Sequence, residues 1–252
     1  MGKRPREDAE MPLLEHVRAL RKVLIISVYA ILLGSIAGWF FSDIVYGYLA
    51  RPITLLEDIN FITTTPLEPM MVKIKVSVFI GVVIMLPVLI WQIWSFLLPA
   101  LKQNEKKYIK IIVPFSVLLF LVGAALCFYV VLPIGIKFLI YAGSGAVQST
   151  PFVTKSSYLT FIIRFLLTFG FVFQMPIVLT ILIRIGILSP KTLAKKRRWA
   201  VLIIVILAVT FSPTPDLVTQ ILMAGPMYLL YEMSIWLGYL VARRREKDLA
   251  TK

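Results

Sequence analysis

The sequence predicts an all-α, polytopic membrane protein with six transmembrane helices, and three observations support this fold class. Of the 252 residues, 59% are hydrophobic and the mean hydropathy is +0.88, whereas soluble domains are roughly half apolar. Apolar runs recur that are long enough to cross a bilayer as helices, which takes about 20 residues. Lys and Arg cluster beside these runs, as they do in membrane proteins with a defined topology. A single membrane domain over residues 11–242 is therefore expected.

The first predicted span follows a polar start. Residues 1–10 are too polar for a signal peptide, and we expect a disordered tail. After Pro12, apolar residues recur at helical spacing, which predicts an amphipathic helix that continues into a span at 23–41. Residues 43–70 carry several acids and predict a loop on the outer side. Three prolines are expected to divide this loop into short pieces: Pro52, Pro66 and Pro69.

The second and third spans are predicted at 76–98 and 111–132. Pro87 lies inside the second span and predicts a kink there. Residues 133–156 are expected to form an outer loop. Two lysines near the start of the second span are expected to extend towards the outer surface: Lys73 and Lys75.

The last three predicted spans are unusual in length. The fourth, at 157–187, is long enough that it should tilt or bend at Pro176. The fifth, at 199–211, has 13 residues and reaches only about 20 Å, against a hydrocarbon core of about 30 Å. The chain then turns and returns through 217–241. Its basic end, residues 243–252, is expected to be a cytoplasmic tail.

The distribution of basic residues predicts the orientation. The N-terminal segment, the second loop, the fourth loop and the C-terminus hold 6, 4, 6 and 5 of the 27 Lys and Arg, against five in the outer segments. Both termini are therefore expected in the cytoplasm. The net charge of +14 could indicate a nucleic-acid partner, but basic residues beside apolar runs instead indicate contact with the headgroups of the lipid bilayer.

Several kinds of chemistry are excluded by composition. One cysteine, Cys127, allows no intrachain disulfide, and one histidine, His16, excludes a metal site with several histidines. No nucleophile with a base, paired aspartates or phosphate-binding loop occurs in the spans. We therefore expect neither an enzyme nor a cofactor.

The segment from Gln92 to Lys107 carries a lone acid, Glu105, among basic residues where the second span leaves the membrane. An isolated carboxylate in such a loop would suit a guest that carries its own positive charge. The alternative interpretation is a solvated loop acid that pairs with Lys102 or Lys106.

Polar residues within the spans are candidates for function. Gln174 in the fourth span either serves a function or forms a helix–helix hydrogen bond. Arg164 is expected to extend towards the outer surface. Asp216 is a candidate cap for the returning helix, and Glu232 is expected to pair with another helix. Gln92 is a candidate for a hydrogen bond within the bundle.

Six fragments in a fixed order resemble the TatC family, the polytopic receptors of the twin-arginine protein export system. The similarity covers most of residues 11–242, and six spans with a short final pair fit it. The fragments are His16 with Leu20-Arg21-Lys22, Gln92 to Phe96, Pro99 to Leu101 followed by Glu105, Phe173 to Pro176, Ser212 to Asp216, and Tyr231-Glu232.

The resemblance implies a concave, cup-like bundle in the inner membrane that binds the paired arginines of signal peptides on folded cargo. It also implies homo-oligomers within a larger complex, small single-span Tat partners and transport driven by the proton-motive force. The implied signal-peptide site comprises Glu105, Phe96, Glu15, Ala19, Leu20, Arg21 and Gln92. Partner-binding or intramembrane polar positions are Gln174, Pro176, Asp216 and Glu232, and structural positions are Pro52 and Pro87.

Two positions depart from the family pattern. Ala19 stands where the family usually has a glutamate before Leu20-Arg21, and Glu15, one helical turn earlier, is a candidate to supply that charge. Gln174 stands where the family often has a second glutamate. Two other functions remain open on the sequence alone: a small-solute transporter that uses Gln174 and Arg164, and a non-transporting membrane scaffold.

Overall fold

The computed structural model describes residues 13–54, 60–97, 109–144, 152–212 and 216–250. These form mainly helices, with two strands of three residues each and short connecting turns. The first half contains α1 (Leu13–Thr54), β1 (Asn60–Ile62), α2 (Glu68–Ile84), α3 (Leu86–Leu97), α4 (Ile109–Leu126), the π-helical turn η3 (Cys127–Val131) and α5 (Leu132–Ser144). The second half contains β2 (Phe152–Thr154), α6 (Lys155–Val172), α7 (Met175–Ile185), α8 (Pro190–Lys195), α9 (Arg197–Phe211) and α10 (Leu217–Ala250).

Three helical segments of the described chain are long and apolar enough to cross a membrane: Val17–Thr54, Ile111–Ile140 and Lys155–Ile185. A fourth is added if α2 and α3, which are bent by 59° at their junction, form one span. A mostly helical fold with apolar helices long enough to span a membrane is thus observed, whereas the count of six spans remains a prediction. The 15 residues of α9 reach only about 22 Å, as expected for a short fifth span.

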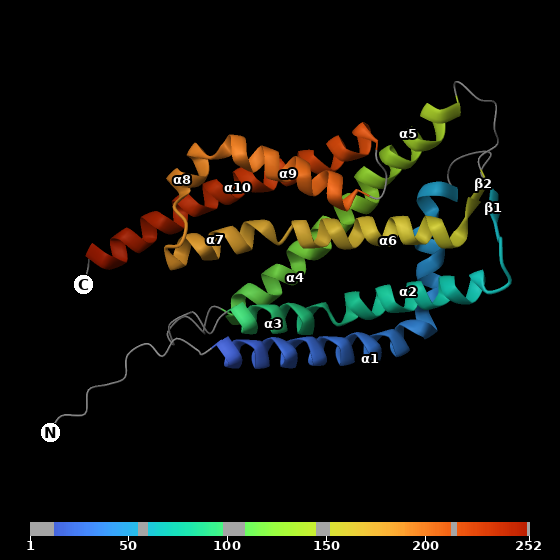
Figure 1. The fold of residues 1–252 in the computed structure, drawn as a ribbon, viewed down its shortest axis with the longest axis horizontal. Helices are drawn as coiled ribbons and strands as arrows, with labels where there is room; N and C mark the ends of the chain where they lie inside the picture. The colour runs from blue at the N-terminus through green and yellow to red at the C-terminus, as the bar shows by residue number, and fades with distance from the viewer. Residues whose placement is uncertain (1–12, 55–59, 98–108, 145–151, 213–215, 251–252) are drawn as a thin grey trace.

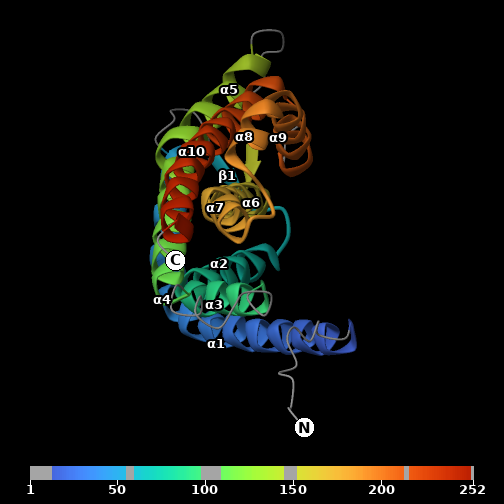
Figure 2. The same cartoon turned by 90° about the vertical axis from the view of Figure 1, so that its left-hand side faces the viewer.

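The helices form a bundle that is curved in cross-section. In Figure 1, α6 and α7 run through the middle, with α1, α2 and α3 on one side and α8, α9 and α10 on the other. Figure 2 shows α4, α5 and α10 stacked along one wall, from which α1 and α9 project at opposite ends. The start of α1, the end of α3, the end of α7 and the end of α10 all lie at one end of the bundle, opposite the two strands (Figure 1).

The predicted outer loop at 43–70 is wrong in its first part, because α1 continues as a helix to Thr54. Pro52 lies in the last turn of α1 and does not break it, since a proline removes only one backbone hydrogen bond. Burial outweighs that loss: Leu49 and Ile53 are buried, and the hydroxyl of Tyr158 donates a hydrogen bond to the carbonyl oxygen of Leu49 at 3.0 Å.

The predicted outer loop at 133–156 is also wrong in its first part, because α5 extends the third span to Ser144. The turn η3 explains how the helix continues past Pro133. Within it, the N–H of Leu132 bonds to the carbonyl oxygen of Cys127, five residues back. Such a π-turn shifts the hydrogen-bond register immediately before the proline, which has no N–H to donate.

The two predicted helix interruptions are present. The bend between α2 and α3 lies at Met85, where Pro87 cannot donate the bond that Val83 would otherwise accept. The fourth span is interrupted at 173–174, between α6 and α7, just before Pro176. Beyond the sixth predicted span, residues 243–250 of the basic C-terminal segment continue α10 as helix.

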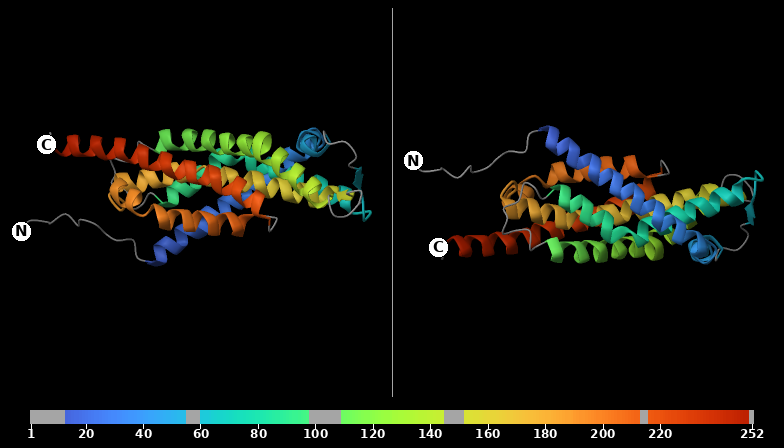
Figure 3. Two further views of the ribbon diagram at one scale, coloured as in Figure 1. Left: turned by 90° about the horizontal axis from the view of Figure 1, so that it is seen from above. Right: turned by 90° about the horizontal axis from the view of Figure 1, so that it is seen from below.

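Small residues let α1 and α2 pack closely, and α1 crosses α2 and α3 obliquely (Figure 3). A Cβ atom on Gly34 would lie 2.7 Å from the carbonyl oxygen of Gly81, and one on Gly38 would lie 2.6 Å from that of Ser77. Glycines four residues apart on one helix are a typical contact between membrane helices, because the backbones can approach each other.

At the far end of the bundle, β1 and β2 form a parallel pair in which Phe61 lies opposite Val153. The carboxylate of Glu68 holds this end together. Its Oε1 accepts a hydrogen bond from the N–H of Ser156 at 2.9 Å, and its Oε2 accepts one from the N–H of Thr64 at 2.8 Å. A buried carboxylate with several donors thus joins the start of α2 to the start of α6.

Candidate functional site

The predicted signal-peptide residues on α1 and α3 lie at the same end of the bundle. Ala19 is half-buried and Arg21 is exposed near the start of α1, while Gln92 and Phe96 are half-buried near the end of α3. The two helices contact each other, α1 crosses α3 obliquely (Figure 3), and the start of α1 and the end of α3 lie at the same end of the bundle in Figure 1. Leu20, between Ala19 and Arg21, is 41% exposed. We call this surface the α1–α3 rim.

Two acids, Glu15 and Glu105, were predicted for this site, and the structure describes the position in the fold of Glu15 alone. Glu105 lies outside the described residues, in the segment that joins α3 to α4, which resumes at Ile109. Glu15 lies in the first turns of α1, one helical turn before Ala19. The charged side chains described near the start of α1 are all basic and exposed: Arg18, Arg21 and Lys22. A cationic guest would be repelled here unless Glu15 and Glu105 supplied negative charge.

Gln174 lies at the interruption between α6 and α7 and joins two helices. Its Nε2 donates a hydrogen bond to the carbonyl oxygen of Ser116 on α4 at 2.9 Å. The hydroxyl of Ser116 in turn accepts a bond from the indole Nε1 of Trp94 on α3 at 3.2 Å. Gln174 therefore belongs to a polar network that links α3, α4 and the fourth span, and Pro176 is buried beside it.

Glu232 of α10 is partnered by another helix. Its Oε1 lies 2.7 Å from Nε of Arg197 at the start of α9, and its Oε2 accepts a bond from Nη2 at 2.8 Å. The hydroxyl of Tyr228 donates a third bond, at 3.1 Å. This two-point pairing fixes the start of α9 against α10.

Asp216 caps α10, since its Oδ1 accepts a hydrogen bond from the N–H of Thr219 at 2.8 Å. Replacing Asp216 by Ala should lower the free energy of unfolding by about 0.5–2 kcal/mol, because that N–H loses its acceptor. Asp216→Asn retains an oxygen acceptor and serves as the control, with a smaller loss expected. Thermal unfolding of the purified protein measures both. An equal loss in the two variants would contradict this reason, because it would show that the acceptor oxygen is not what stabilises the helix.

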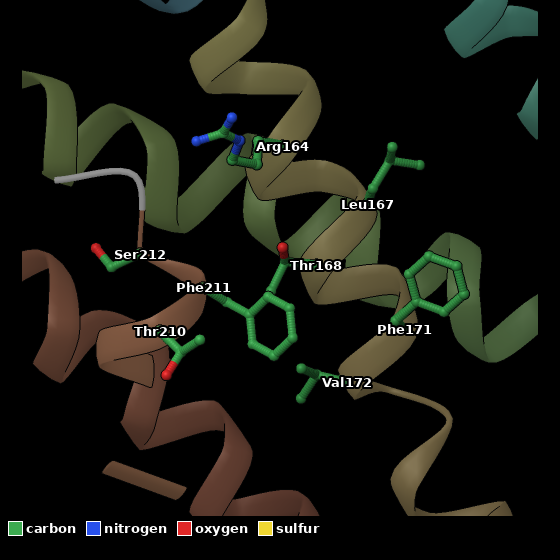
Figure 4. A pocket seen from close by; sticks show the side chains of 8 residues that line it. All are labelled: Arg164, Leu167, Thr168, Phe171, Val172, Thr210, Phe211 and Ser212. Atoms are coloured by element: carbon green, nitrogen blue, oxygen red, sulfur yellow. The ribbon is translucent and has the colours of Figure 1, made fainter. Parts of the chain in front are cut away.

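The sequence did not predict that Lys75 and Arg164 approach the same cavity. A cavity of about 300 Å³ at the start of α6 is lined by Lys75, Thr160 and Arg164. A second, of about 510 Å³, runs between α6 and the end of α9 (Figure 4). Their shared residue is Arg164, for which the sequence predicted either extension towards the outer surface or, in the alternative function, a role in small-solute transport. Among the described residues, no three His, Cys, Asp or Glu side chains gather as metal ligands would.

The fold therefore defines a helical membrane protein whose polar residues lie at one rim, between helices and beside two cavities. A family model described as Sec-independent protein translocase protein (TatC) matches residues 15–226. The chain is 41% identical over 233 residues to Sec-independent protein translocase protein TatC of Carboxydothermus hydrogenoformans, covering 92% of this chain and 94% of that protein. It is 38% identical over 238 residues to TatC of Aquifex aeolicus, covering 94% and 98%.

Solved structures agree with these sequence relatives. A crystal structure described as the twin arginine translocase receptor TatC superposes with a TM-score of 0.78 at 38% identity, covering 90% of this chain and 99% of that one. A second, of the same receptor in DDM, gives a TM-score of 0.79. The chain belongs to the TatC family. It is thus a membrane component of a Sec-independent protein translocase.

Proposed function

We propose that this protein is the receptor subunit that binds twin-arginine signal peptides of folded cargo at the cytoplasmic face of the inner membrane. The observation that carries the proposal is the likeness over 90% of the chain to structures described as twin arginine translocase receptors. The α1–α3 rim supports it, because it brings residues from two separate sequence fragments to one end of the bundle.

The chemistry of the proposed site is carboxylate–guanidinium pairing. Each guanidinium presents parallel N–H donors that match both oxygens of a carboxylate, and hydrogen bonds to charged groups contribute about 1.5–3 kcal/mol each. A lysine ammonium lacks this planar fork, so a twin-lysine peptide should bind more weakly. Glu105 is the proposed acceptor, and Phe96 of the α1–α3 rim is proposed to contact the same peptide.

The proposed receptor assembles with small single-span Tat subunits and with further copies of itself, and uses the proton-motive force. Apolar helix surface is available for such partners or for lipid. Along α9, Leu202, Ile203 and Ile206 are each about half exposed. Family membership favours a translocase component over the small-solute transporter and the scaffold that the sequence alone left open.

A titration tests the proposal directly. Purified full-length protein is titrated with a fluorescent twin-arginine signal peptide and with its twin-lysine version. We expect the twin-lysine peptide to bind about tenfold or more weakly, which is the value of one lost charged hydrogen bond. Equal affinities, or no binding of either peptide, would contradict a receptor role.

A separate prediction concerns Glu15. Glu15→Gln should weaken binding of the twin-arginine peptide several-fold, because Ala19 cannot supply the family's usual charge at that turn of α1. Adding Ala19→Glu to that variant should restore binding, since it moves a carboxylate one helical turn along the same face. Peptide titration measures both variants, and unchanged affinity in Glu15→Gln would refute a role for this acid.

A further inference from the structure

A second feature of the molecule, independent of the rim, is an excess of positive charge at the cavity beside the start of α6. Lys75 is half-buried and its Nζ donates hydrogen bonds to Oγ of Ser156 at 2.7 Å and to Oγ1 of Thr160 at 2.8 Å. Both acceptors are neutral. No carboxylate of the described residues lies within salt-bridge distance of Lys75 or Arg164, which leaves two cations beside one cavity without a paired anion.

Glu68 bonds the same Ser156 as Lys75, but it does not line the cavity and forms no ion pair with Lys75 or Arg164. Its single negative charge offsets at most one of the two positive charges. Its two oxygens already accept hydrogen bonds from Ser156 and Thr64. The first turn of the 18-residue helix α6 adds the positive end of its dipole on the same side. The cavity therefore favours an anion.

An apolar groove continues from this cavity. Arg164 lines both spaces, and beyond it the larger one is lined mainly by Leu167, Phe171, Val172 and Phe211. Figure 4 shows Arg164 and Thr168 on α6 facing the end of α9, where Phe211 lies. An occupant that is anionic at one end and apolar along its length would match the two spaces together.

The depth of the site also fits an amphiphile. Arg164 lies nine residues after Lys155, so it is about 13 Å below the start of α6. The short helix α9 ends at this level, beside Thr168 (Figure 4). A bilayer that thins to match a short helix would bring lipid phosphates to this depth.

We propose that the two cavities form one binding site for an anionic phospholipid. Its phosphate lies between Lys75 and Arg164, and one acyl chain follows the groove between α6 and α9. Phosphate oxygens accept hydrogen bonds from the guanidinium of Arg164 and from the ammonium of Lys75, while the acyl chain covers apolar surface that the protein leaves open.

The test uses full-length protein in detergent and native mass spectrometry with added lipids of identical acyl chains. We expect phosphatidylglycerol to bind about tenfold more tightly than phosphatidylcholine, whose headgroup has no net charge. Arg164→Gln should abolish this preference. Lys137→Gln is the matched control, since it removes one exposed charge on α5 away from both cavities and should keep the preference.

Two further measurements separate a lipid from a free anion. Thr168→Trp fills the groove without altering either cation, and should reduce binding of phosphatidylglycerol by a similar factor. Glycerol 3-phosphate, which carries the anion without acyl chains, should not displace the lipid when added in about hundredfold excess. Equal binding of the two lipids, an unchanged preference in Arg164→Gln, or displacement by glycerol 3-phosphate would each overturn the proposal.

Discussion

Replacing Glu105 by Gln should weaken binding of a twin-arginine signal peptide by about tenfold to hundredfold. The amide keeps the size of the side chain and one acceptor oxygen, but it loses the charge and the second acceptor that a guanidinium engages. The effect should be large because Arg18, Arg21 and Lys22 near the start of α1 are basic, which leaves Glu15 as the one proposed acid on that helix. Peptide titration against the unmodified protein measures the change.

The control removes a negative charge elsewhere. Asp43 is exposed on α1 and pairs with Lys73 at 3.1 Å, well away from the start of that helix. Asp43→Asn should leave peptide affinity unchanged, because an exposed ion pair contributes little and does not touch the rim. If the Glu105 and Asp43 variants bind the peptide equally well, Glu105 is only a solvated loop acid.

Replacing Gly81 by Ala should lower the free energy of unfolding by about 1–3 kcal/mol. A Cβ atom there would lie 2.6 Å from the backbone nitrogen of Ser35 and 2.9 Å from the carbonyl carbon of Gly34. Backbone atoms cannot turn aside as a side chain can, so α1 and α2 must separate along their contact. A lower midpoint of thermal unfolding should follow.

Gly47→Ala provides a matched substitution on α1, where a Cβ atom would meet nothing within 4 Å. Both changes gain the same helix preference of alanine over glycine, about 1 kcal/mol, so their difference isolates the steric cost. We expect Gly47→Ala to be neutral or stabilising. If Gly81→Ala is equally stable, the two helices are not held together by this close approach.

The sequence predicted features that depend on local chemistry. Pro87 and Pro176 were correctly associated with interruptions of their spans, because a missing N–H acts on its own helix. Conversely, Pro52 and the residues after Pro133 were assigned to loops although the helices continue. The helix continues past Pro52 because Leu49 and Ile53 are buried against other helices, and past Pro133 because a π-turn shifts the hydrogen-bond register. The presence of a proline alone indicates neither effect.

Some residues of the candidate sites were also identified from the sequence, whereas others were found only in the fold. Family fragments identified Gln92, Phe96 and Arg21, and the fold adds that α1 and α3 place them at one end. The hydrogen bond between the carboxylate of Glu68 and the N–H of Ser156 joins residues about 90 positions apart, and no local sequence pattern indicates this contact. The sequence also did not predict that Lys75 and Arg164 line the same cavity, because these residues are about equally far apart in the chain. Gly34 and Gly38, four residues apart, were a signal that the sequence did offer for the contact of α1 with α2.

Site-specific crosslinking tests the receptor role most directly. A photoreactive phenylalanine analogue replaces Phe96 on the α1–α3 rim or, as a matched control, Phe152, which is 64% exposed on β2 at the opposite end. The receptor role predicts that a twin-arginine peptide crosslinks at position 96, that its twin-lysine version crosslinks much less, and that neither crosslinks at 152. Crosslinks at 152, or equal yields from both peptides at 96, would contradict it.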